Sequence, residues 1–437
     1  MLSVEDNETL TRVGPGTPMG ELFRRFWLPA MTSDELPVND GDPIRLRLLC
    51  EDLVGFRDTN GKVGIMGARC PHRQAPLFFG RNEECGIRCA YHGWKFDVDG
   101  NCVDMPNEPP GRQFKQRIKQ VAYPTHEQGG VVWIYMGPAE HQPERIPQFE
   151  WVTAPEGHQF VAKWLQRTNW AQGMEGEIDT SHISFLHSSK EAYNPEALVA
   201  QSPIVLDRAA LDGAPRLSLL ETSYGFCYGA RRTLDEEYYW RVTKWLFPMY
   251  SMIPGTASGG AGRCWVPIDD EHTWTFHYQC RDDRPFSEDE VRQFWKGGGF
   301  PPRVERRPYT LPDGYIIDGW VPTANRENDY HIDRDMQRDV NFTGIWGVNE
   351  QDRSLQEGMG GQIVDRSKEH LGTADVAALS ARRLLINMAR KLQKGENPTV
   401  PHEPDFYKLR PLEVVTELDD FSSVLDKYDE TLGTATM

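Results

Sequence analysis

Residues 69–96 read RCPHRQAPLFFGRNEECGIRCAYHGWKF and hold two short segments, each with one cysteine and one histidine. One residue separates Cys70 from His72, and two residues separate Cys89 from His92. Thiolates and imidazoles bind iron and zinc well. Two such segments can hold a binuclear iron–sulfur centre from two sides, or a single tetrahedral zinc ion.

The iron–sulfur interpretation explains these residues better than zinc does. In a Rieske [2Fe–2S] centre two cysteines bind one iron and two histidines bind the other. The Cys70-x-His72 spacer is shorter than the usual spacing in zinc sites, although Cys89-x-x-His92 would suit zinc. Both segments, one with Cys-Pro-His and one with Tyr-His-Gly-Trp, resemble the signature of Rieske proteins. We therefore expect a [2Fe–2S] cluster bound by Cys70, His72, Cys89 and His92.

The length of 437 residues predicts two domains. Short alternating runs and turn signals between residues 42 and 137 indicate a small all-β module, and a proline-containing stretch at 137–148 resembles a domain boundary. We expect a Rieske domain at residues 24–140 and an α+β catalytic domain at 150–437, with residues 1–23 packed on the latter.

Periodicity predicts the elements of the second domain. Runs at 217–230, 238–246 and 273–280 alternate like strands, and residues 374–394 carry a helical apolar stripe that stops at Gly395. A helical stretch is expected over 164–190. The predicted fold class is therefore α+β, an all-β module followed by an antiparallel sheet with helices.

The net charge of −17 argues against nucleic-acid or anionic-membrane binding, because an acidic surface repels phosphate. The first ten residues lack the basic and apolar segments of a secretory signal, and the clearest apolar run, at 131–136, is far too short to span a membrane. Eight cysteines are too few for a disulfide scaffold. These features predict a soluble, cytoplasmic protein.

A second candidate metal site lies in residues 169–187, NWAQGMEGEIDTSHISFLH. Asp179 and His182 are three residues apart and would share one face of a helix. His182 and His187 are five apart, about 140° out of phase on a regular helix, so a break or bulge is needed for both to reach one metal. Two histidines and a distant carboxylate would form the facial triad of non-haem Fe(II) oxygenases.

Together these motifs resemble the oxygenase component of Rieske non-haem iron oxygenases, in the phthalate dioxygenase branch. The resemblance also covers residues 11–20 and 349–383. It implies a helix-grip-like catalytic domain and a third iron ligand far downstream, an aspartate that follows an acidic residue. Asp352 is the expected ligand, with Glu350 and Asp365 as competitors.

The resemblance further implies the partners and the electron path. A flavin and iron–sulfur reductase would pass electrons from NADH to the cluster, and the mononuclear Fe(II) would activate O₂ beside the substrate. Family members form head-to-tail trimers, sometimes stacked as hexamers. Asp179 matches the family's bridging aspartate, between His182 and a cluster histidine of the neighbouring subunit, for which we expect His92.

The family guides the substrate prediction to an aromatic carboxylate, most simply phthalate or a related benzoate undergoing cis-dihydroxylation. A buried carboxylate needs a cationic partner. Arg208 and Arg241 are the predicted substrate-binding residues, chosen from the cations that follow the His–His segment: Arg208, Arg216, Arg231, Arg232, Arg241 and Lys244. Strand alternation places Arg241 and Thr243 on one face, with Trp240, Val242 and Lys244 on the other.

Other functions stay open at this point. Monooxygenation or O-demethylation of an aromatic acid would use the same ligand set, and fold alone does not separate these reactions. A pure Rieske electron carrier would leave the large second domain without a role. A zinc-stabilised binding protein would explain still less.

Overall fold

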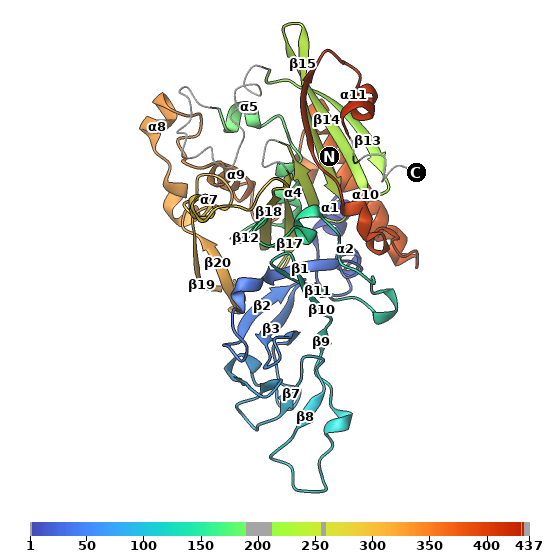
Figure 1. Ribbon diagram of the computed structural model, residues 1–437, viewed down its shortest axis with the longest axis vertical. Helices are drawn as coiled ribbons and strands as arrows, with labels where there is room; N and C mark the ends of the chain where they lie inside the picture. The colour runs from blue at the N-terminus through green and yellow to red at the C-terminus, as the bar shows by residue number, and fades with distance from the viewer. Residues whose placement is uncertain (1, 189–211, 255–258, 430, 432–437) are drawn as a thin grey trace.

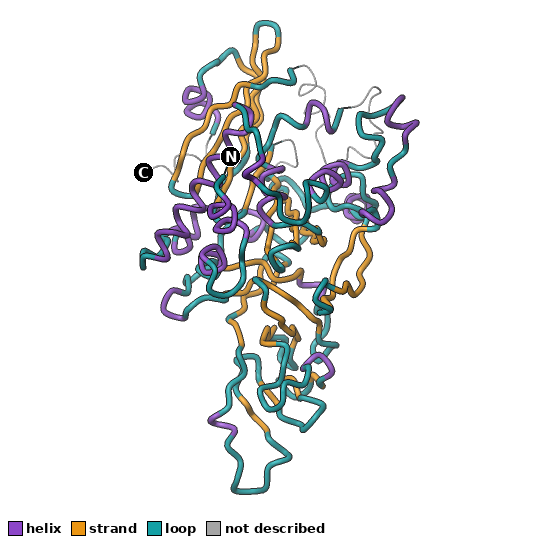
Figure 2. Tube along the Cα trace, turned by 180° about the vertical axis from the view of Figure 1, so that it is seen from behind, coloured by secondary structure: helices purple, strands orange, loops and turns teal. Residues whose placement is uncertain are grey.

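The computed structural model describes residues 2–188, 212–254, 259–429 and 431. The molecule is elongated, with a small lobe of short strands and loops below a larger lobe built on one extended sheet (Figure 1). Figure 2 shows the same division from behind. In the described ranges no helix combines the length and apolar character needed to cross a membrane.

The small lobe is all-β. Its strands form three antiparallel sheets: β1 (Trp27–Thr32), β11 (Val131–Tyr135) and β10 (Thr125–Gln128); β2 (Ile44–Leu48), β3 (Glu51–Arg57), β4 (Val63–Gly67) and β9 (Ala122–Tyr123); β5 (Arg81–Asn82), β6 (Ile87–Arg88), β7 (Lys95–Phe96) and β8 (Cys102–Asp104). A separate apolar cluster that includes Val54, Phe56 and Met66 fills the space beneath the two Cys–His segments. This small core gives those segments a fixed base.

The large lobe contains one antiparallel sheet whose strands run in the order β12 (Gln159–Gln166), β18 (Thr273–Cys280), β17 (Ala261–Pro267), β16 (Tyr250–Ile253), β15 (Glu237–Leu246), β14 (Gly225–Leu234) and β13 (Arg216–Thr222), with β21 (Leu412–Thr416) also paired to β15. A hairpin of β19 (Val304–Thr310) and β20 (Ile316–Pro322) stands beside it. Both faces of the central strands are buried. Trp274 and Thr275, for example, point to opposite faces of the sheet, and both are almost inaccessible to solvent. Polar side chains on one face are therefore held inside the lobe.

The described residues also form α-helices, some of which pack on this sheet. They are α1 (Val4–Thr11), α2 (Pro18–Phe23), α3 (Glu150–Thr153), α4 (Trp170–Glu177), α5 (Ile183–Leu186), α7 (Glu288–Phe294), α8 (Arg334–Asp339), α9 (Val348–Gln356), α10 (Val376–Gln393) and α11 (Phe421–Tyr428). Short 3₁₀ helices connect them: η1 (Ser33–Glu35), η2 (Leu77–Phe79), η3 (Lys115–Arg117), η4 (Ala139–His141), η6 (Arg326–His331), η7 (Arg366–Lys368), η8 (Thr373–Asp375), η9 (Val400–His402) and η10 (Pro404–Tyr407). Helix α10 packs on β13 and β14 and contacts α1 and α2.

The expected α+β fold class is correct, and α10 lies within two residues of the predicted helix. The helix expected over 164–190 is wrong in its first part. Residues 159–166 are strand β12, which pairs along its whole length with β18. A short, largely apolar sequence is compatible with either a helix or a buried strand. Here the pairing of residues 159–166 with β18 determines that they form a strand.

Candidate metal centres

The two Cys–His segments fold into turns of the same form. The amide of Gln74 donates to the carbonyl of Cys70, and the amide of Gly93 donates in the same way to Cys89. The residue four positions after each cysteine has a positive φ, +60° at Gln74 and +76° at Gly93. A side chain at Gly93 would also collide with Pro106, so glycine is required there. Each turn therefore presents its cysteine and histidine in a similar way.

The four side chains converge as two pairs. The thiols of Cys70 and Cys89 are buried in the same apolar cluster, and burial raises the pKa of the Cys70 thiol to about 12. The half-buried rings of His72 and His92 meet edge to face, with centroids 4.5 Å apart. An inner pair of thiols and an outer pair of imidazoles match the Cys₂/His₂ division of a Rieske cluster.

These four side chains fit a single zinc ion poorly. Tetrahedral zinc would hold its sulfur and nitrogen ligands less than about 4 Å apart. In the described part of the chain, one group of candidate ligands has all its donor atoms within 4.8 Å of one another. That group is His182, His187 and Asp352, and not the Cys–His set. The wider spacing of the Cys–His set is what a binuclear centre requires.

The second set of candidate ligands lies where α4 ends. The chain leaves α4 at Glu177, and His182 and His187 stand at the two ends of the four-residue helix α5. Asp179 therefore lies in a loop, whereas the sequence predicted that it shares a helical face with His182. The position of its side chain is fixed by a turn, because its Oδ1 accepts a hydrogen bond from the amide of Ser181 at 2.7 Å. Because α5 ends before His187, both imidazoles can turn to one side.

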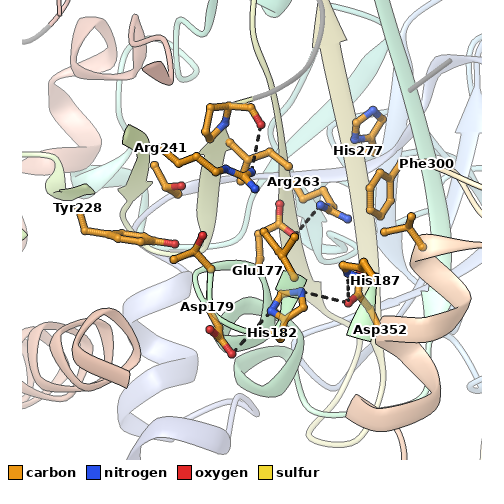
Figure 3. A pocket seen from close by; sticks show the side chains of 16 residues that line it. Glu177, Asp179, His182, His187, Tyr228, Arg241, Arg263, His277, Phe300 and Asp352 are labelled. Carbon is orange, nitrogen blue, oxygen red and sulfur yellow. Dashed lines mark hydrogen bonds and ion pairs between the residues drawn. The ribbon is translucent and has the colours of Figure 1, made fainter. Parts of the chain in front are cut away.

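Asp352 of α9 meets both imidazoles (Figure 3). Its Oδ1 lies 3.5 Å from Nε2 of His182 and 3.2 Å from Nε2 of His187. The opposite nitrogens have their own partners: Nδ1 of His182 is 3.6 Å from Oδ2 of Asp179, and Nδ1 of His187 is 2.7 Å from Oε1 of Gln351. Two Nε2 atoms and a carboxylate oxygen thus face one point, as a facial triad requires.

The other two acidic candidates lie elsewhere. Glu350 is buried, and its carboxylate faces the backbone amide of Arg303 at 3.4 Å. Asp365 is exposed, caps η7 and pairs with Lys368 at 3.0 Å. Asp352 is accordingly the candidate whose position suits the histidines.

A cavity extends from this triad along the polar face of the sheet, and its wall carries charges of both signs. Nη2 of Arg263 forms a 2.7 Å ion pair with Glu177, and the guanidinium lies 3.5 Å from the centre of the Phe300 ring. Burial raises the pKa of Glu177, although Arg263 opposes this. Tyr228, Thr243 and Val348 also line the cavity.

Arg241 of β15 projects into the same cavity (Figure 3). Its Nη2 donates to the carbonyl of Pro254 at 3.2 Å, whereas its Nε and Nη1 are buried without a hydrogen-bond partner among the described residues. Glu413 lies opposite Arg241 in the strand register, but no described carboxylate lies within ion-pair distance of the guanidinium. A buried guanidinium with two free donors is suited to bind an anion.

The remaining predicted cations occupy other places. Arg208 lies outside the described residues. Lys244 pairs with Asp429 on the far face of β15, and Arg232 donates to the carbonyl of Thr180 at 2.8 Å behind the cavity wall. Arg216 and Arg231 are cross-strand neighbours near the surface. Glu177, Arg263, His277 and Gln351 were missed from sequence, because only their spatial neighbours mark them as parts of the site.

The fold and the two ligand sets together define a Rieske-type iron oxygenase. Comparison with protein families agrees: the Rieske [2Fe-2S] domain matches residues 26–122, and the family described as LigXa C-terminal domain like matches residues 134–412. The chain belongs to the Rieske non-haem iron oxygenases, as an oxygenase subunit. Proteins of this family carry a [2Fe–2S] cluster and a mononuclear iron and consume O₂.

Individual relatives are similar over nearly the whole chain. The 3-chlorobenzoate-3,4-dioxygenase oxygenase subunit of Comamonas testosteroni is 39% identical over 419 residues, 93% of each chain. The phthalate 4,5-dioxygenase oxygenase subunit of Pseudomonas putida is 39% identical over 403 residues, 91% of this chain and 88% of the relative. The crystal structure of dicamba monooxygenase bound to dicamba shares the fold, with a TM-score of 0.57, 16% identity and coverage of 85% of this chain and 98% of that one.

Proposed function

We propose that this oxygenase subunit hydroxylates an aromatic carboxylate, most simply by cis-dihydroxylation of phthalate or a related benzoate. The observation that carries this proposal is Arg241, a buried cation with two free donors in the cavity that leads to the His–His–Asp group. The names of the two 39% identical relatives, which act on a chlorobenzoate and on phthalate, support the same substrate class.

Each candidate ligand receives a role in this proposal. Cys70, Cys89, His72 and His92 would hold the [2Fe–2S] cluster, and His182, His187 and Asp352 the mononuclear iron. The cluster supplies single electrons when bound, and the iron supplies a site for O₂. In the net reaction the arene and O₂ take up two electrons and two protons to give a cis-dihydrodiol, the electrons coming from NADH.

The residues of the chain position the substrate for that reaction. Arg241 would bind the carboxylate through a charge-assisted pair of hydrogen bonds. Tyr228 offers aromatic surface to the ring, and the buried side chains that line the cavity limit water near the reacting carbon. Arg208 stays a predicted second contact that lies outside the described residues.

Electron transfer is proposed to cross between subunits. The cluster segments lie in the lower lobe and α5 in the upper part of the other lobe, so the route within one chain is long (Figure 1). Asp179 faces His182 with one carboxylate oxygen, and its side chain is 37% exposed, which leaves it accessible to a neighbouring subunit. We infer a head-to-tail trimer, or two stacked trimers, with His92 of one subunit beside Asp179 of the next, and a flavin and iron–sulfur reductase as electron donor.

Product analysis tests the reaction. The holoenzyme is supplied with NADH, O₂ and a surrogate reductase, and offered phthalate, benzoate, 3-chlorobenzoate and methoxybenzoates. A cis-dihydrodiol from one of the first three supports the proposal. Release of formaldehyde from a methoxybenzoate, without ring dihydroxylation, would support O-demethylation instead. It is a second candidate because the 5,5'-dehydrodivanillate O-demethylase oxygenase subunit is 30% identical over 95% of this chain.

The role of Arg241 is tested by binding. Arg241→Met should weaken the binding of benzoate at least about tenfold, because a buried carboxylate loses its charge-assisted partner. Arg231→Met is the matched control, since Arg231 lies one strand away and outside the cavity. Equal affinity of the wild type and Arg241→Met for every benzoate would remove Arg241 from the substrate site.

A further inference from the structure

His277 is a buried histidine whose ring nitrogens have no hydrogen-bond partner among the described residues. It lies on β18 and is 2% exposed, and neither Nδ1 nor Nε2 makes a hydrogen bond of normal geometry. Leaving a buried polar group unpaired costs free energy, and such groups in native proteins call for an explanation. His277 also lines the cavity shared by Arg241 and the His–His–Asp group, so the missing partner can be a bound molecule.

The surroundings of His277 keep its imidazole neutral and fixed. The ring stacks on Phe300 with centroids 5.6 Å apart and an interplanar angle of 29°. Burial, helped by the nearby Arg263 cation, lowers the pKa of His277 to about 3, although a backbone contact with Gly262 acts in the other direction. A neutral imidazole offers one N–H donor and one lone pair. It therefore suits an uncharged polar group such as a hydroxyl.

The charges around the cavity explain why the substrate group that contacts His277 should be uncharged. Arg263 is the cross-strand neighbour of His277, but its guanidinium is already paired with Glu177. Among the described residues that line the cavity, Arg241 is the cation that lacks an acidic partner. A second carboxylate placed at His277 would be buried without a counter-charge, which is costly.

The positions of the two residues restrict the geometry of the ligand. Arg241 lies on β15 and His277 on β18, with β16 and β17 between them in the sheet. The strand register puts His277 in line with Arg263, Ser251 and Trp245, so Arg241 lies four residues further along β15. Three strand spacings of about 4.8 Å and four residues of about 3.4 Å put the two backbone positions roughly 20 Å apart before the side chains extend. In Figure 3 the two side chains lie on either side of Arg263. An ortho substituent, next to a carboxylate held by Arg241, would lie on the Arg241 side of this arrangement.

We propose that His277 binds an uncharged hydrogen-bonding substituent, meta or para to the carboxylate that Arg241 holds, and so selects hydroxybenzoate-type substrates over dicarboxylates whose second carboxylate is meta or para. This inference rests on the proposed function and narrows its substrate class. His277 and Arg241 then contact the two ends of one aromatic ring, and the ring edge between them faces the iron ligands.

Equilibrium binding to the metal-loaded holoenzyme, without O₂, tests the proposal. The ligands are benzoate, 3-hydroxybenzoate, 4-hydroxybenzoate, 3-chlorobenzoate, isophthalate and terephthalate. In the wild type one hydroxybenzoate should bind about tenfold more tightly than benzoate, 3-chlorobenzoate and both dicarboxylates. His277→Phe should abolish this preference and leave the affinity for benzoate within about twofold, whereas His277→Gln, which keeps a donor and an acceptor, should retain part of it.

Several outcomes would overturn the role of His277. They are a preference that survives in His277→Phe, a dicarboxylate that binds most tightly, or a crystal structure with ligand in which His277 contacts only an ordered water. The cluster absorption and the iron content of each variant check that it has folded. Arg241→Met tests the proposed function separately. If only the role of His277 is wrong, the hydroxyl preference is absent but benzoate binding still depends on Arg241.

Discussion

Nδ1 of His187 lies 2.7 Å from Oε1 of Gln351, the residue that directly precedes Asp352 on α9. One turn of this helix therefore supplies both a candidate iron ligand and the amide that orients a second candidate ligand. The Gln351 amide is itself fixed, because its Nε2 donates to the carbonyl of Ile345 at 2.9 Å. The imidazole is thereby held as the tautomer whose Nε2 is free to bind metal.

The first prediction concerns this amide. Gln351→Leu should weaken mononuclear iron binding by about 10- to 100-fold, the usual effect of losing a partner that orients a ligand. Iron retained during titration with a chelator measures the change, and the cluster spectrum should stay unaltered. Gln356→Leu is the control, since Gln356 lies on the same helix and pairs with Gln166, away from both histidines. Iron affinity that is unchanged in Gln351→Leu would contradict the orienting role.

Asp352 itself should be indispensable for the mononuclear iron. Asp352→Ala removes the carboxylate that both imidazoles face, so we expect loss of one iron per subunit with the [2Fe–2S] absorption intact. Metal analysis together with the visible spectrum measures both centres in one sample. Glu350→Gln and Asp365→Ala serve as controls and should keep the iron. If either control lost it while Asp352→Ala did not, the third ligand would have to be reassigned.

Asp179→Asn should separate electron transfer from metal binding. The amide keeps the oxygen that accepts from Ser181 but loses the charge beside His182, so both metals should stay while turnover with NADH falls by at least about tenfold. Hydrogen peroxide carries both the oxygen atoms and the two electrons of the reaction, and product formation driven by peroxide should survive the substitution. Near wild-type turnover with NADH would refute a bridging role for Asp179.

A buried ion pair joins β12 to the small lobe. Nζ of Lys163 lies 2.6 Å from Oε1 of Glu35, and both side chains are fully inaccessible. Lys163→Met should destabilise the protein by about 3–5 kcal/mol, because Glu35 is left buried without a counter-charge. The double variant Lys163→Met/Glu35→Gln should recover most of this loss, as urea denaturation would measure. A double variant no more stable than Lys163→Met would show that the pair is not the cause.

The sequence marks candidate ligands that lie close together in the chain more readily than distant ones. Each Cys–His segment lies within four residues, so its spacing alone predicts that the cysteine and the histidine are close in space. Asp352 lies 165 residues after His187, and only the family resemblance could point to it. Alternation did place Arg241 and Thr243 on one face of β15, and both line the cavity. It could not reveal His277 as a site residue, because a polar strand face is usually solvated and this one is enclosed by tertiary packing.

The last prediction is a pH dependence of stability. His277 is neutral in the folded protein down to a pKa of about 3, whereas in the unfolded chain it takes up a proton below its ordinary value of about 6.5. Its contribution is therefore fully present above pH 6.5 and is lost as the pH falls towards 3, by about 2 kcal/mol at pH 5. Urea denaturation of the wild type and His277→Gln at pH 7 and pH 5 should show a smaller loss in the variant, by about that amount. His370→Gln, a change at an exposed histidine, should follow the wild type. Equal losses in the wild type and His277→Gln would mean that His277 accepts a proton in the folded protein, and hence that its buried ring has a partner after all.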